Sequence, residues 1–312
     1  MATKILITGG AGNVGSSLAD FLTNKTSNEI VIFDNLLTGS VKKLPSDKKK
    51  NWKFIKGDVN NYKDISAVMT SVQFDYVFHY AAVVGVKRTI DNPKMVLNDI
   101  EGIKNVLDLS KNTGVNRVFY SSSSEVYGEP VEMPQNEETT PLNSKLPYAI
   151  VKNLGEAFLK SYNQEYGLDF TIFRFFNTYG PNQSKDFVIT KFLFLALANK
   201  DITIYGDGNQ TRTFCYIEDN LEITNLILEN GYFRNEIVNI GNDVEYNIKD
   251  LAEIIINITK SKSKIVHLAP LKDGDMTRRQ PDISKMKKIL KRDLIILEEG
   301  IKKVIKFSKW IY

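Results

Sequence analysis

Residues 4–15 read KILITGGAGNVG, and this stretch predicts the fold of the first half of the chain. An apolar run of strand character ends at Thr8, and four closely spaced glycines follow before a helical pattern begins over Ser16–Leu22. Glycines at such a junction let the backbone approach a pyrophosphate, and the N-terminus of the next helix offers unpaired N–H groups. The stretch therefore predicts a dinucleotide-binding turn between a strand and a helix.

The end of the second predicted strand indicates which dinucleotide this turn would hold. Asp34 lies 19 residues after Gly15, where its carboxylate can accept hydrogen bonds from both ribose hydroxyls and repel a 2′-phosphate. NAD is therefore favoured over NADP. In the competing Walker A loop, Gly10 and Gly15 would have the right separation, but Ser16 stands where that loop requires lysine. A glycine-rich turn that binds no ligand is also disfavoured, because such a turn would not need Asp34 at the ribose-binding position.

Short runs of strand character alternate with segments of helical length through the first half of the chain. The predicted strands are Lys4–Thr8, Glu29–Phe33, Trp52–Lys56, Tyr76–Tyr80, Arg117–Ser121 and Asp169–Phe175. Such alternation is typical of a parallel sheet with helices on both faces. The sequence therefore predicts an α/β fold built on a doubly wound parallel sheet of the Rossmann type.

The pattern changes after Pro181, where shorter mixed elements predict a smaller α/β lobe at the C-terminal end. The expected elements are a helix over 187–199, a turn-rich segment over 205–209 and a basic helix near 299–309. We expect a dinucleotide-binding domain over residues 1–177 and a substrate lobe over 178–312. Segments near 213–242 could return to the first domain.

The composition argues against several classes of protein. The chain has 312 residues with 41 basic and 37 acidic side chains, and its net charge of +4 is spread along the sequence, so we expect no nucleic-acid partner. Cys215 is the only cysteine, which excludes an internal disulfide and a multi-cysteine metal centre, and we expect no metal. The two histidines, His79 and His267, lack a nucleophile-elbow pattern and are interpreted as structural.

Nothing in the sequence predicts a secreted or membrane-spanning protein. The N-terminal residues enter the first strand without a basic segment, a long apolar segment and a cleavage site. The most apolar stretch, residues 76–86, is much shorter than the ~20 apolar residues that a membrane helix needs. We therefore expect a soluble, cytoplasmic protein.

Tyr148 and Lys152 form the candidate catalytic pair, because their spacing of four places them on one face of a helix. A nearby ammonium stabilises a phenolate and can lower the pKa of a tyrosine toward neutrality. The pair alone is weak, since this spacing is common on helix surfaces. A second segment strengthens it: the strand over residues 117–121 runs into SSSSEVYG at 121–128, which brings hydroxyls and a carboxylate to the ligand-binding edge of the sheet.

Together, the glycine loop, the serine-rich strand end and the Tyr-x-x-x-Lys pair resemble the extended short-chain dehydrogenase/reductase family of nucleotide-sugar epimerases, dehydratases and decarboxylases. The resemblance spans nearly the whole chain, and Asn13 in place of a glycine favours the extended branch. It implies NAD as the cofactor and a nucleotide-diphosphate sugar as the substrate. The residues that it assigns to NAD are Gly9, Gly12, Asn13, Val14, Gly15, Asp34, Asn35, Asp58, Val59, Ala81, Ala82, Tyr148 and Lys152.

The resemblance also implies roles at the reacting centre. Tyr148, with Lys152 as its partner, would remove the proton from the hydroxyl at carbon 4 of the sugar while hydride leaves for the nicotinamide. Ser123 would hydrogen-bond that hydroxyl, and the neighbouring Ser124 is expected to contact the sugar. Asp99 stands where the family usually has asparagine, so no role is assigned to it.

The substrate diphosphate is expected to lie against residues of the second half of the chain. The resemblance implies that Asn177 binds the diphosphate, with Arg212 and Arg279 as charged clamps. Surface ion pairs remain the alternative for both arginines.

The fate of the oxidised sugar stays open in the sequence. A 4-epimerase is the main expectation, and a 4,6-dehydratase, a uronate decarboxylase and a simple 4-dehydrogenase are the alternatives. Glu125 lies on the same side of an extended strand as Ser123 and could be the base of a dehydratase or a group that only hydrogen-bonds the sugar. A binding module that merely senses NAD is disfavoured, because the chain keeps both Tyr148 and Lys152. Helical segments near 94–112 and 148–165 resemble the pair through which this family dimerises, which implies a homodimer or a higher homo-oligomer.

Overall fold

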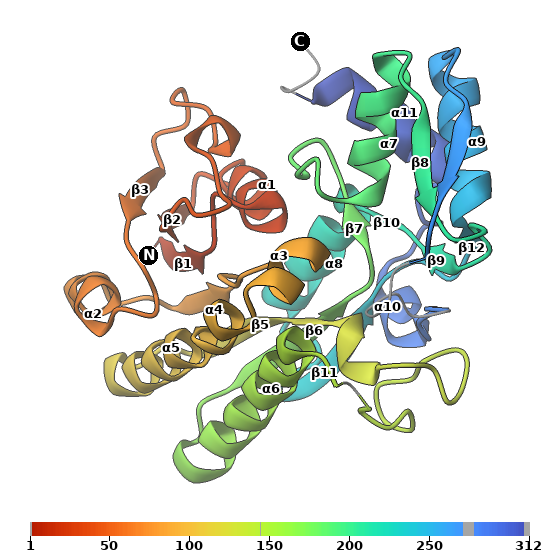
Figure 1. Cartoon of the computed structure of the whole chain (residues 1–312). Coiled ribbons are helices and arrows are strands. Elements are labelled where there is room, and N and C mark those ends of the chain that lie inside the picture. Colours follow the sequence, from red (N-terminus) through yellow and green to blue (C-terminus); the bar gives the residue numbers. More distant parts are fainter. Residues whose placement is uncertain (1, 144, 271–277, 309–312) are drawn as a thin grey trace.

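A computed structural model describes residues 2–143, 145–270 and 278–308, and its centre is a parallel sheet of seven strands (Figure 1). In spatial order the strands are β11 (Glu236–Ile240), β6 (Phe170–Phe175), β5 (Arg117–Ser123), β4 (Tyr76–His79), β1 (Thr3–Thr8), β2 (Asn28–Asp34) and β3 (Trp52–Lys56). All six predicted strands are present and the predicted Rossmann-like fold is confirmed.

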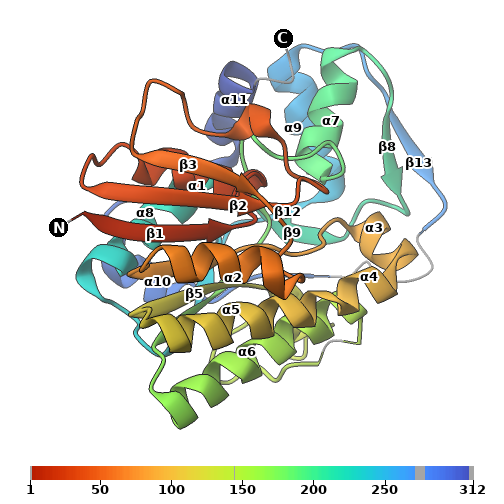
Figure 2. The same ribbon diagram turned by 90° about the vertical axis from the view of Figure 1, so that its left-hand side faces the viewer.

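Two layers of helices cover this sheet (Figure 2). One face carries α2 (Tyr62–Ser71), α5 (Asp99–Thr113) and α6 (Pro147–Tyr166), and the other carries α1 (Asn13–Leu22) and α8 (Ile217–Asn230). Successive side chains of a strand point to opposite faces, so Leu6 joins the core beneath the first layer while Ile5 and Ile7 join the core beneath the second. Strands buried on both faces explain why these segments read as continuous apolar runs.

The smaller lobe lies at the right of Figure 1 and is built around three helices and short paired strands. Its helices are α7 (Val188–Leu197), α9 (Ile248–Thr259) and α11 (Leu297–Phe307), with α9 in contact with both of the others. Its strand pairs are β8 (Ile202–Tyr205) with β13 (Ile265–Leu268), and β9 (Thr211–Thr213) with β12 (Glu245–Asn247). The helices expected over 187–199 and near 299–309 are α7 and α11, although residues 309–312 lie outside the described part of the chain.

The second half of the chain does not stay in the smaller lobe. After β7 (Thr178–Tyr179) pairs with β10 (Cys215–Tyr216), α8 packs against α1 and β11 extends the sheet beside β6. The remaining short elements are α3 (Val86–Asp91), α4 (Pro93–Leu97), α10 (Ser284–Ile289) and single turns of 3-10 helix at Val41–Lys43 and Ser124–Tyr127. The chain thus crosses between the two halves several times, which places residues from both at one cleft.

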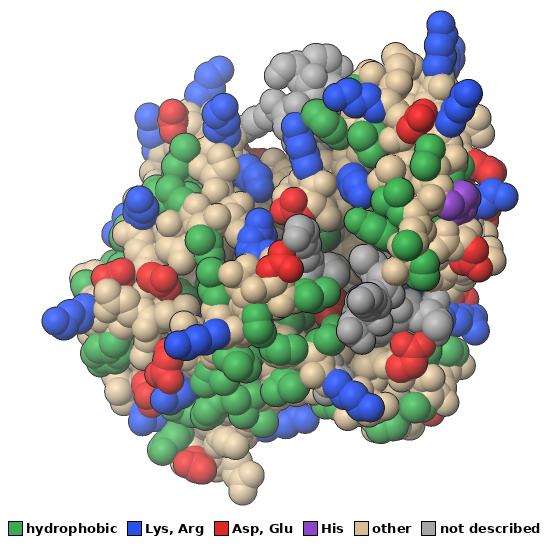
Figure 3. All heavy atoms as spheres, viewed as in Figure 1, with side chains coloured by type: hydrophobic (Ala, Val, Ile, Leu, Met, Phe, Trp, Pro, Cys, Tyr) green, Lys and Arg blue, Asp and Glu red, His purple; other side chains and the backbone are tan. Residues whose placement is uncertain are grey.

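The surface carries both signs of charge, and its apolar side chains gather over α4, α5 and α6 near the lower centre of Figure 3. Met95, Leu97, Ile150 and Leu154 are among the exposed apolar residues of α4 and α6. Within the described residues, no helix combines the length and the apolar character needed to cross a membrane.

Candidate active site

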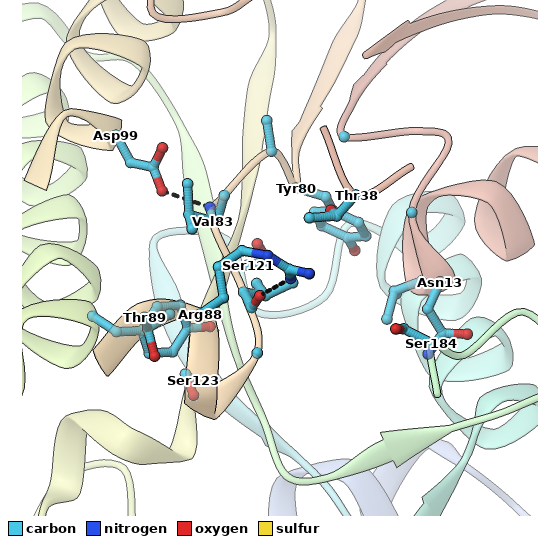
Figure 4. A pocket seen from close by; sticks show the side chains of 18 of the residues that line it. Asn13, Thr38, Tyr80, Val83, Arg88, Thr89, Asp99, Ser121, Ser123 and Ser184 are labelled. Atoms are coloured by element: carbon cyan, nitrogen blue, oxygen red, sulfur yellow. Dashed lines mark hydrogen bonds between the residues drawn. The ribbon is translucent and has the colours of Figure 1, made fainter. Parts of the chain in front are cut away.

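A pocket of about 1000 Å³ opens where the carboxyl ends of the sheet strands face the smaller lobe. Residues that follow β1, β2, β3, β4, β5 and β6 all line it, and Figure 4 shows part of the lining, with Asn13, Tyr80 and Ser123 around one space. Ligands of open α/β sheets bind at this edge, because the chain reverses direction there and leaves a crevice between loops. The pocket is therefore the candidate active site.

The glycine loop forms one wall of the pocket. Its backbone is packed so closely that a side chain at these positions would collide with neighbouring backbone atoms. Gly9 has a φ of +66°, and a Cβ on it would lie 2.6 Å from the amide nitrogen of Ala81. A Cβ on Gly15 would lie 2.4 Å from the carbonyl oxygen of Gly9, and one on Gly12 would lie 3.1 Å from the same atom. The loop thus leaves a cradle before α1 in which a pyrophosphate fits against bare backbone.

Asp34 is held at the end of β2 by backbone donors. The amide of Ala11 donates to one carboxylate oxygen over 3.0 Å, and the amide of Leu36 donates to the other over 2.7 Å. The side chain is buried but lines the pocket, so its orientation is set before any ligand arrives. Asn35 donates to Asp58 over 3.1 Å, which ties this turn to the loop after β3.

The structure brings all the residues expected to bind NAD to the wall of this pocket: Gly9, Gly12, Asn13, Val14, Gly15, Asp34, Asn35, Asp58, Val59, Ala81, Ala82, Tyr148 and Lys152. Three charged lining residues were missed: Lys43, Arg88 and Asp99. Burial lowers the pKa of Lys43, and the charge of Asp34 partly offsets that change. Arg88 donates to the carbonyl of Val84 over 2.7 Å and lies 3.3 Å from the Asp186 carboxylate. The sequence could not predict that these three residues line the pocket, because the loops that bring them there have no regular spacing.

Tyr148 and Lys152 lie one turn apart in the first part of α6, as their spacing predicts. Pro147 occupies the first turn of that helix, where its missing N–H costs nothing. The Lys152 ammonium donates to the carbonyl of Ser121 over 2.6 Å and lies 5.8 Å from the centre of the Tyr148 ring. The helix therefore delivers a phenol and an ammonium together to the end of β5.

The expected lowering of the Tyr148 pKa is not what the protein's own groups produce. Burial raises the pKa of Tyr148, Glu125 raises it further, and a hydrogen bond with Ser123 only partly compensates. Burial also lowers the pKa of Lys152 to about 8, against the opposing charges of Asp99 and Glu156. The expectation for the Tyr148 pKa failed because helical spacing shows only that Tyr148 and Lys152 are close. Burial, which raises the pKa, depends on the packing of the whole site.

A buried polar network supports α6 from below. Glu156, one turn after Lys152, accepts two hydrogen bonds from Arg174, at 2.9 and 2.7 Å, and both side chains are 2% exposed. Ser122 donates to the same carboxylate over 2.5 Å, and Arg174 donates to the Tyr127 hydroxyl over 2.8 Å. Strands β5 and β6 are thereby fixed to the helix that carries the catalytic pair.

Glu125 and Arg279 face each other across the pocket. Ser123 accepts a hydrogen bond from the Glu125 amide over 3.2 Å, and a carboxylate oxygen of Glu125 lies 3.5 Å from the Arg279 guanidinium. Ser123, Ser124, Glu125 and Arg279 all line the pocket. The end of β5 thus presents a hydroxyl and a carboxylate to the space into which Arg279, from the C-terminal part of the chain, brings a guanidinium.

The other two residues expected to bind the substrate differ in their positions. Asn177 lines the pocket with a φ of +39° and donates to the Thr213 carbonyl over 3.0 Å. Arg212 is buried, donates to the Thr211 carbonyl over 2.7 Å and is not among the residues that line the pocket. The clamp role of Arg212 therefore has no support from the pocket geometry and stays a prediction.

Neither histidine has the surroundings of a catalytic base. His79 is buried beside the Thr8 hydroxyl, 2.9 Å away, and burial lowers its pKa to about 3. His267 is exposed and its ring nitrogen lies 2.8 Å from the carbonyl oxygen of Gly206. Among the described residues, no group of three histidine, cysteine or acidic side chains is placed to hold a metal ion.

Comparison with known proteins points in the same direction as the geometry. Residues 5–241 match the family model described as the NAD dependent epimerase/dehydratase family. A putative UDP-glucose 4-epimerase of Methanocaldococcus jannaschii is 34% identical, with 98% of each chain covered. A UDP-N-acetyl-alpha-D-glucosaminuronate decarboxylase of Bacillus cytotoxicus is also 34% identical, over 100% of this chain and 99% of the relative. The crystal structure of a UDP-glucose 4-epimerase with UDP-glucose from Thermotoga maritima superposes with a TM-score of 0.91, at 30% identity and with 98% of each chain covered.

Proposed function

This chain belongs to the NAD-dependent epimerase/dehydratase family, and we propose that it is an enzyme that oxidises carbon 4 of the sugar in a nucleotide-diphosphate sugar. The observation that carries the proposal is the meeting of Tyr148, Lys152 and Ser123 at the end of a pocket whose other end holds the glycine loop and Asp34. NAD would span that distance, with its adenosine ribose at Asp34 and its nicotinamide near Lys152.

The proposed chemistry assigns one task to each side chain at the reacting end. When bound, NAD supplies the acceptor for hydride from carbon 4. Tyr148 would take the proton of the 4-hydroxyl, and Ser123, which already hydrogen-bonds Tyr148, would hold that hydroxyl in line. Lys152 would stabilise the phenolate through its charge. Removal of the proton and departure of the hydride leave a 4-keto sugar, and the proton stays on Tyr148.

Re-reduction of the keto sugar on its other face is the main proposal for the net reaction, which makes the enzyme a 4-epimerase. The relatives from Methanocaldococcus jannaschii and Thermotoga maritima named as 4-epimerases support it. Phe187 and Phe214 line the same pocket as Tyr148 and would give the sugar apolar walls on the side of the smaller lobe.

Decarboxylation or dehydration is the second candidate, and the Glu125–Arg279 pair favours it. In this candidate Arg279 binds a sugar carboxylate instead of the diphosphate, and Glu125 takes the proton from carbon 5 once the neighbouring keto group has made it acidic. The relative from Bacillus cytotoxicus, named as a uronate decarboxylase, is as similar in sequence as the epimerase-named one.

Product analysis separates these reactions. The protein is incubated in deuterated water with NAD and, in turn, UDP-glucose, UDP-glucuronate and dTDP-glucose, and the products are identified by mass spectrometry and NMR. We expect an epimer of unchanged mass and no deuterium at carbon 5. Loss of carbon dioxide would establish a decarboxylase instead. Loss of water with deuterium at carbon 5, abolished in Glu125→Gln, would establish a dehydratase. Absence of any product and of NADH with all nucleotide-sugars would refute carbon-4 oxidation itself.

We also propose a cytoplasmic homodimer that joins through α5 and α6. The apolar side chains Met95, Leu97, Ile150 and Leu154 are exposed beside and on these helices, and such a patch is typical of an interface (Figure 3). Light scattering at micromolar concentration should give twice the chain mass of 35.4 kDa, and Ile150→Asp should give the single mass. A wild-type monomer would contradict the proposed homodimer but would not bear on the proposed oxidation at carbon 4.

A further inference from the structure

A strap of the smaller lobe borders the dinucleotide site, and the proposed chemistry gives it no task. This strap comprises residues 181–187, between β7 and α7, and in Figure 1 it projects from the start of α7 toward α1. Gln183 and Ser184 line the pocket. Asn182 and Asp186 are not among the lining residues, and their side chains make contacts elsewhere. Those contacts indicate what the strap does.

The crevice beside the strap lies between β1 and β4. These two strands are neighbours in the sheet, but the chain leaves β1 for α1 on one face and leaves β4 for α5 on the other. An open α/β sheet has its ligand crevice where neighbouring strands send their connections to opposite faces. A dinucleotide whose pyrophosphate lies against the glycine loop and the N-terminus of α1 therefore crosses this crevice.

On one side of the crevice the strap is bonded to α1. The side-chain amide of Asn182 donates to the Ser16 hydroxyl over 3.0 Å and to the Ser17 hydroxyl over 3.4 Å. Ser17 in turn donates to the carbonyl of Asn13 over 2.8 Å, in the first turn of the helix. Ser184 lines the same pocket as Asn13 (Figure 4). The strap is thus joined to the helix end at which a pyrophosphate would lie.

On the other side of the crevice the strap is bonded to α3, which follows β4. A carboxylate oxygen of Asp186 lies 3.3 Å from the guanidinium of Arg88. Arg88 also donates to the carbonyl of Val84 over 2.7 Å, which holds its side chain against its own helix. Within the strap, Ser184 donates to the Asp186 carboxylate over 3.0 Å. The strap therefore links the two elements that flank the crevice.

The strap has a firm root and weak outer contacts. Gln183 is buried, donates to the Thr178 carbonyl over 2.9 Å and accepts from the Thr190 hydroxyl over 3.0 Å. By contrast, the side chains of Arg88 and Asp186 are 34% and 53% exposed, and an ion pair that water reaches contributes little. The outer contacts can therefore break while the root stays packed in the smaller lobe.

We propose that the strap controls the passage of NAD: it closes over the pyrophosphate by joining α1 to α3, and the dinucleotide enters and leaves only when these contacts open. Asn182 and Asp186 hold the strap closed and need not touch the dinucleotide. A closure of this kind slows entry and exit together. Loss of the outer contacts should therefore raise both rate constants and change the equilibrium affinity less than either.

The test measures binding of NADH by stopped-flow fluorescence, with release followed by a chase of excess NAD. Asp186→Asn keeps a hydrogen-bonding partner for Ser184 but loses the charge, so release should be about twofold to fivefold faster, the range of an exposed ion pair. Asn182→Ala should accelerate release about twofold to tenfold, as expected for lost hydrogen bonds. The double variant should be faster than either, and association should accelerate in all three.

The sign of the Asp186→Asn effect separates the strap from a direct effect of charge. Removal of a carboxylate near a pyrophosphate would by itself tighten binding and slow release. Slower release in Asp186→Asn, or unchanged release in the double variant, would overturn the proposal. Faster release with unchanged association would also overturn it, because a lost contact to the ligand acts on release alone. The matched control is Asp243→Asn, which removes an exposed ion pair with Lys287 in the smaller lobe and should leave both rates unchanged.

A second measurement needs no variant. In wild type, hydrogen exchange of a peptide that covers residues 181–187 should slow at least about threefold when NADH is added, because a dinucleotide beneath Ser184 favours the closed strap. Exchange that NADH does not alter would overturn the proposal even if a variant failed to fold. Both measurements follow binding alone, so a protein that binds NADH as expected but oxidises no sugar would refute only the proposed function.

Discussion

The two ends of the pocket are built by different means. At the glycine loop the shape comes from bare backbone, and the carboxylate of Asp34 is held there by two backbone amides. At the reacting end the shape comes from side chains, and each buried charge has its own partner: Lys152 donates to the carbonyl of Ser121, and Glu156 accepts from Arg174. Close packing of the backbone fixes the shape of the cofactor end, whereas pairing between buried charged groups stabilises the reacting end.

This difference predicts how each end responds to substitution. Added atoms should damage the cofactor end, because the neighbouring backbone cannot move away cheaply. Altered charges should damage the reacting end, because a lost partner leaves another group buried without compensation. Four substitutions test the comparison.

Tyr148→Phe should have the largest effect and should break only the reacting end. The substitution removes the hydroxyl that takes the substrate proton, so NADH formation should fall at least about 100-fold, within the 10²–10⁴ range of a lost general base. The affinity for NAD, measured by calorimetry, should stay within about twofold of wild type because the ring remains. Turnover close to that of wild type would remove Tyr148 from its proposed role.

Glu156→Ala should show that the reacting end depends on buried charge. The Arg174 guanidinium would stay buried without its carboxylate, so the free energy of unfolding should fall by about 3–5 kcal/mol in chemical denaturation. The exposed pair of Glu101 with Lys104 supplies the control, since Glu101→Ala should cost at most about 1 kcal/mol. Equal costs for the two variants would contradict this view of the site.

Gly15→Ala should break only the cofactor end. The new Cβ would lie 2.4 Å from the Gly9 carbonyl oxygen, and relief of that overlap should cost about 1–3 kcal/mol. The affinity for NAD, measured by calorimetry, should fall about tenfold to 100-fold as the loop shifts. Gly114→Ala is the control: this glycine has a φ of +74° and open space around it, so the new methyl group meets no neighbour and NAD affinity should not change. A Gly15→Ala protein with unchanged affinity would show that the cradle is not where the cofactor lies.

Asp34→Ala should have the smallest effect, because it alters the choice of cofactor more than the site. Wild type should bind NAD more tightly than NADP, and the variant should narrow that ratio by about tenfold, since it loses charge-assisted hydrogen bonds to the ribose. Separate titrations with the two dinucleotides measure the ratio. Equal wild-type affinities for both would contradict the assignment of Asp34.

The sheet could be predicted because most of its strands carry a continuous apolar run and the glycine loop marks the first crossover. A return of segments near 213–242 to the first domain was expected as an option, but strand β11 at Glu236–Ile240 was not itself predicted, because its place beside β6 depends on a long excursion through the smaller lobe. The raised pKa of Tyr148 was missed for a related reason, since burial is a property of the assembled fold. Asp99 stands at a position where the family usually has asparagine, so the motif assigned it no role. Its hydrogen bond with Val83 can be seen only in the folded structure.

The late return of β11 to the sheet has a consequence for the chain while it is being made. The ribosome releases β6 before residues 236–240 exist, so the outer edge of β6 has no strand to pair with during that interval. An unpaired edge of this kind can capture the same edge of another nascent chain. The segment between β6 and β11 therefore sets how long each new molecule is exposed to aggregation, although most of it takes no part in the sheet.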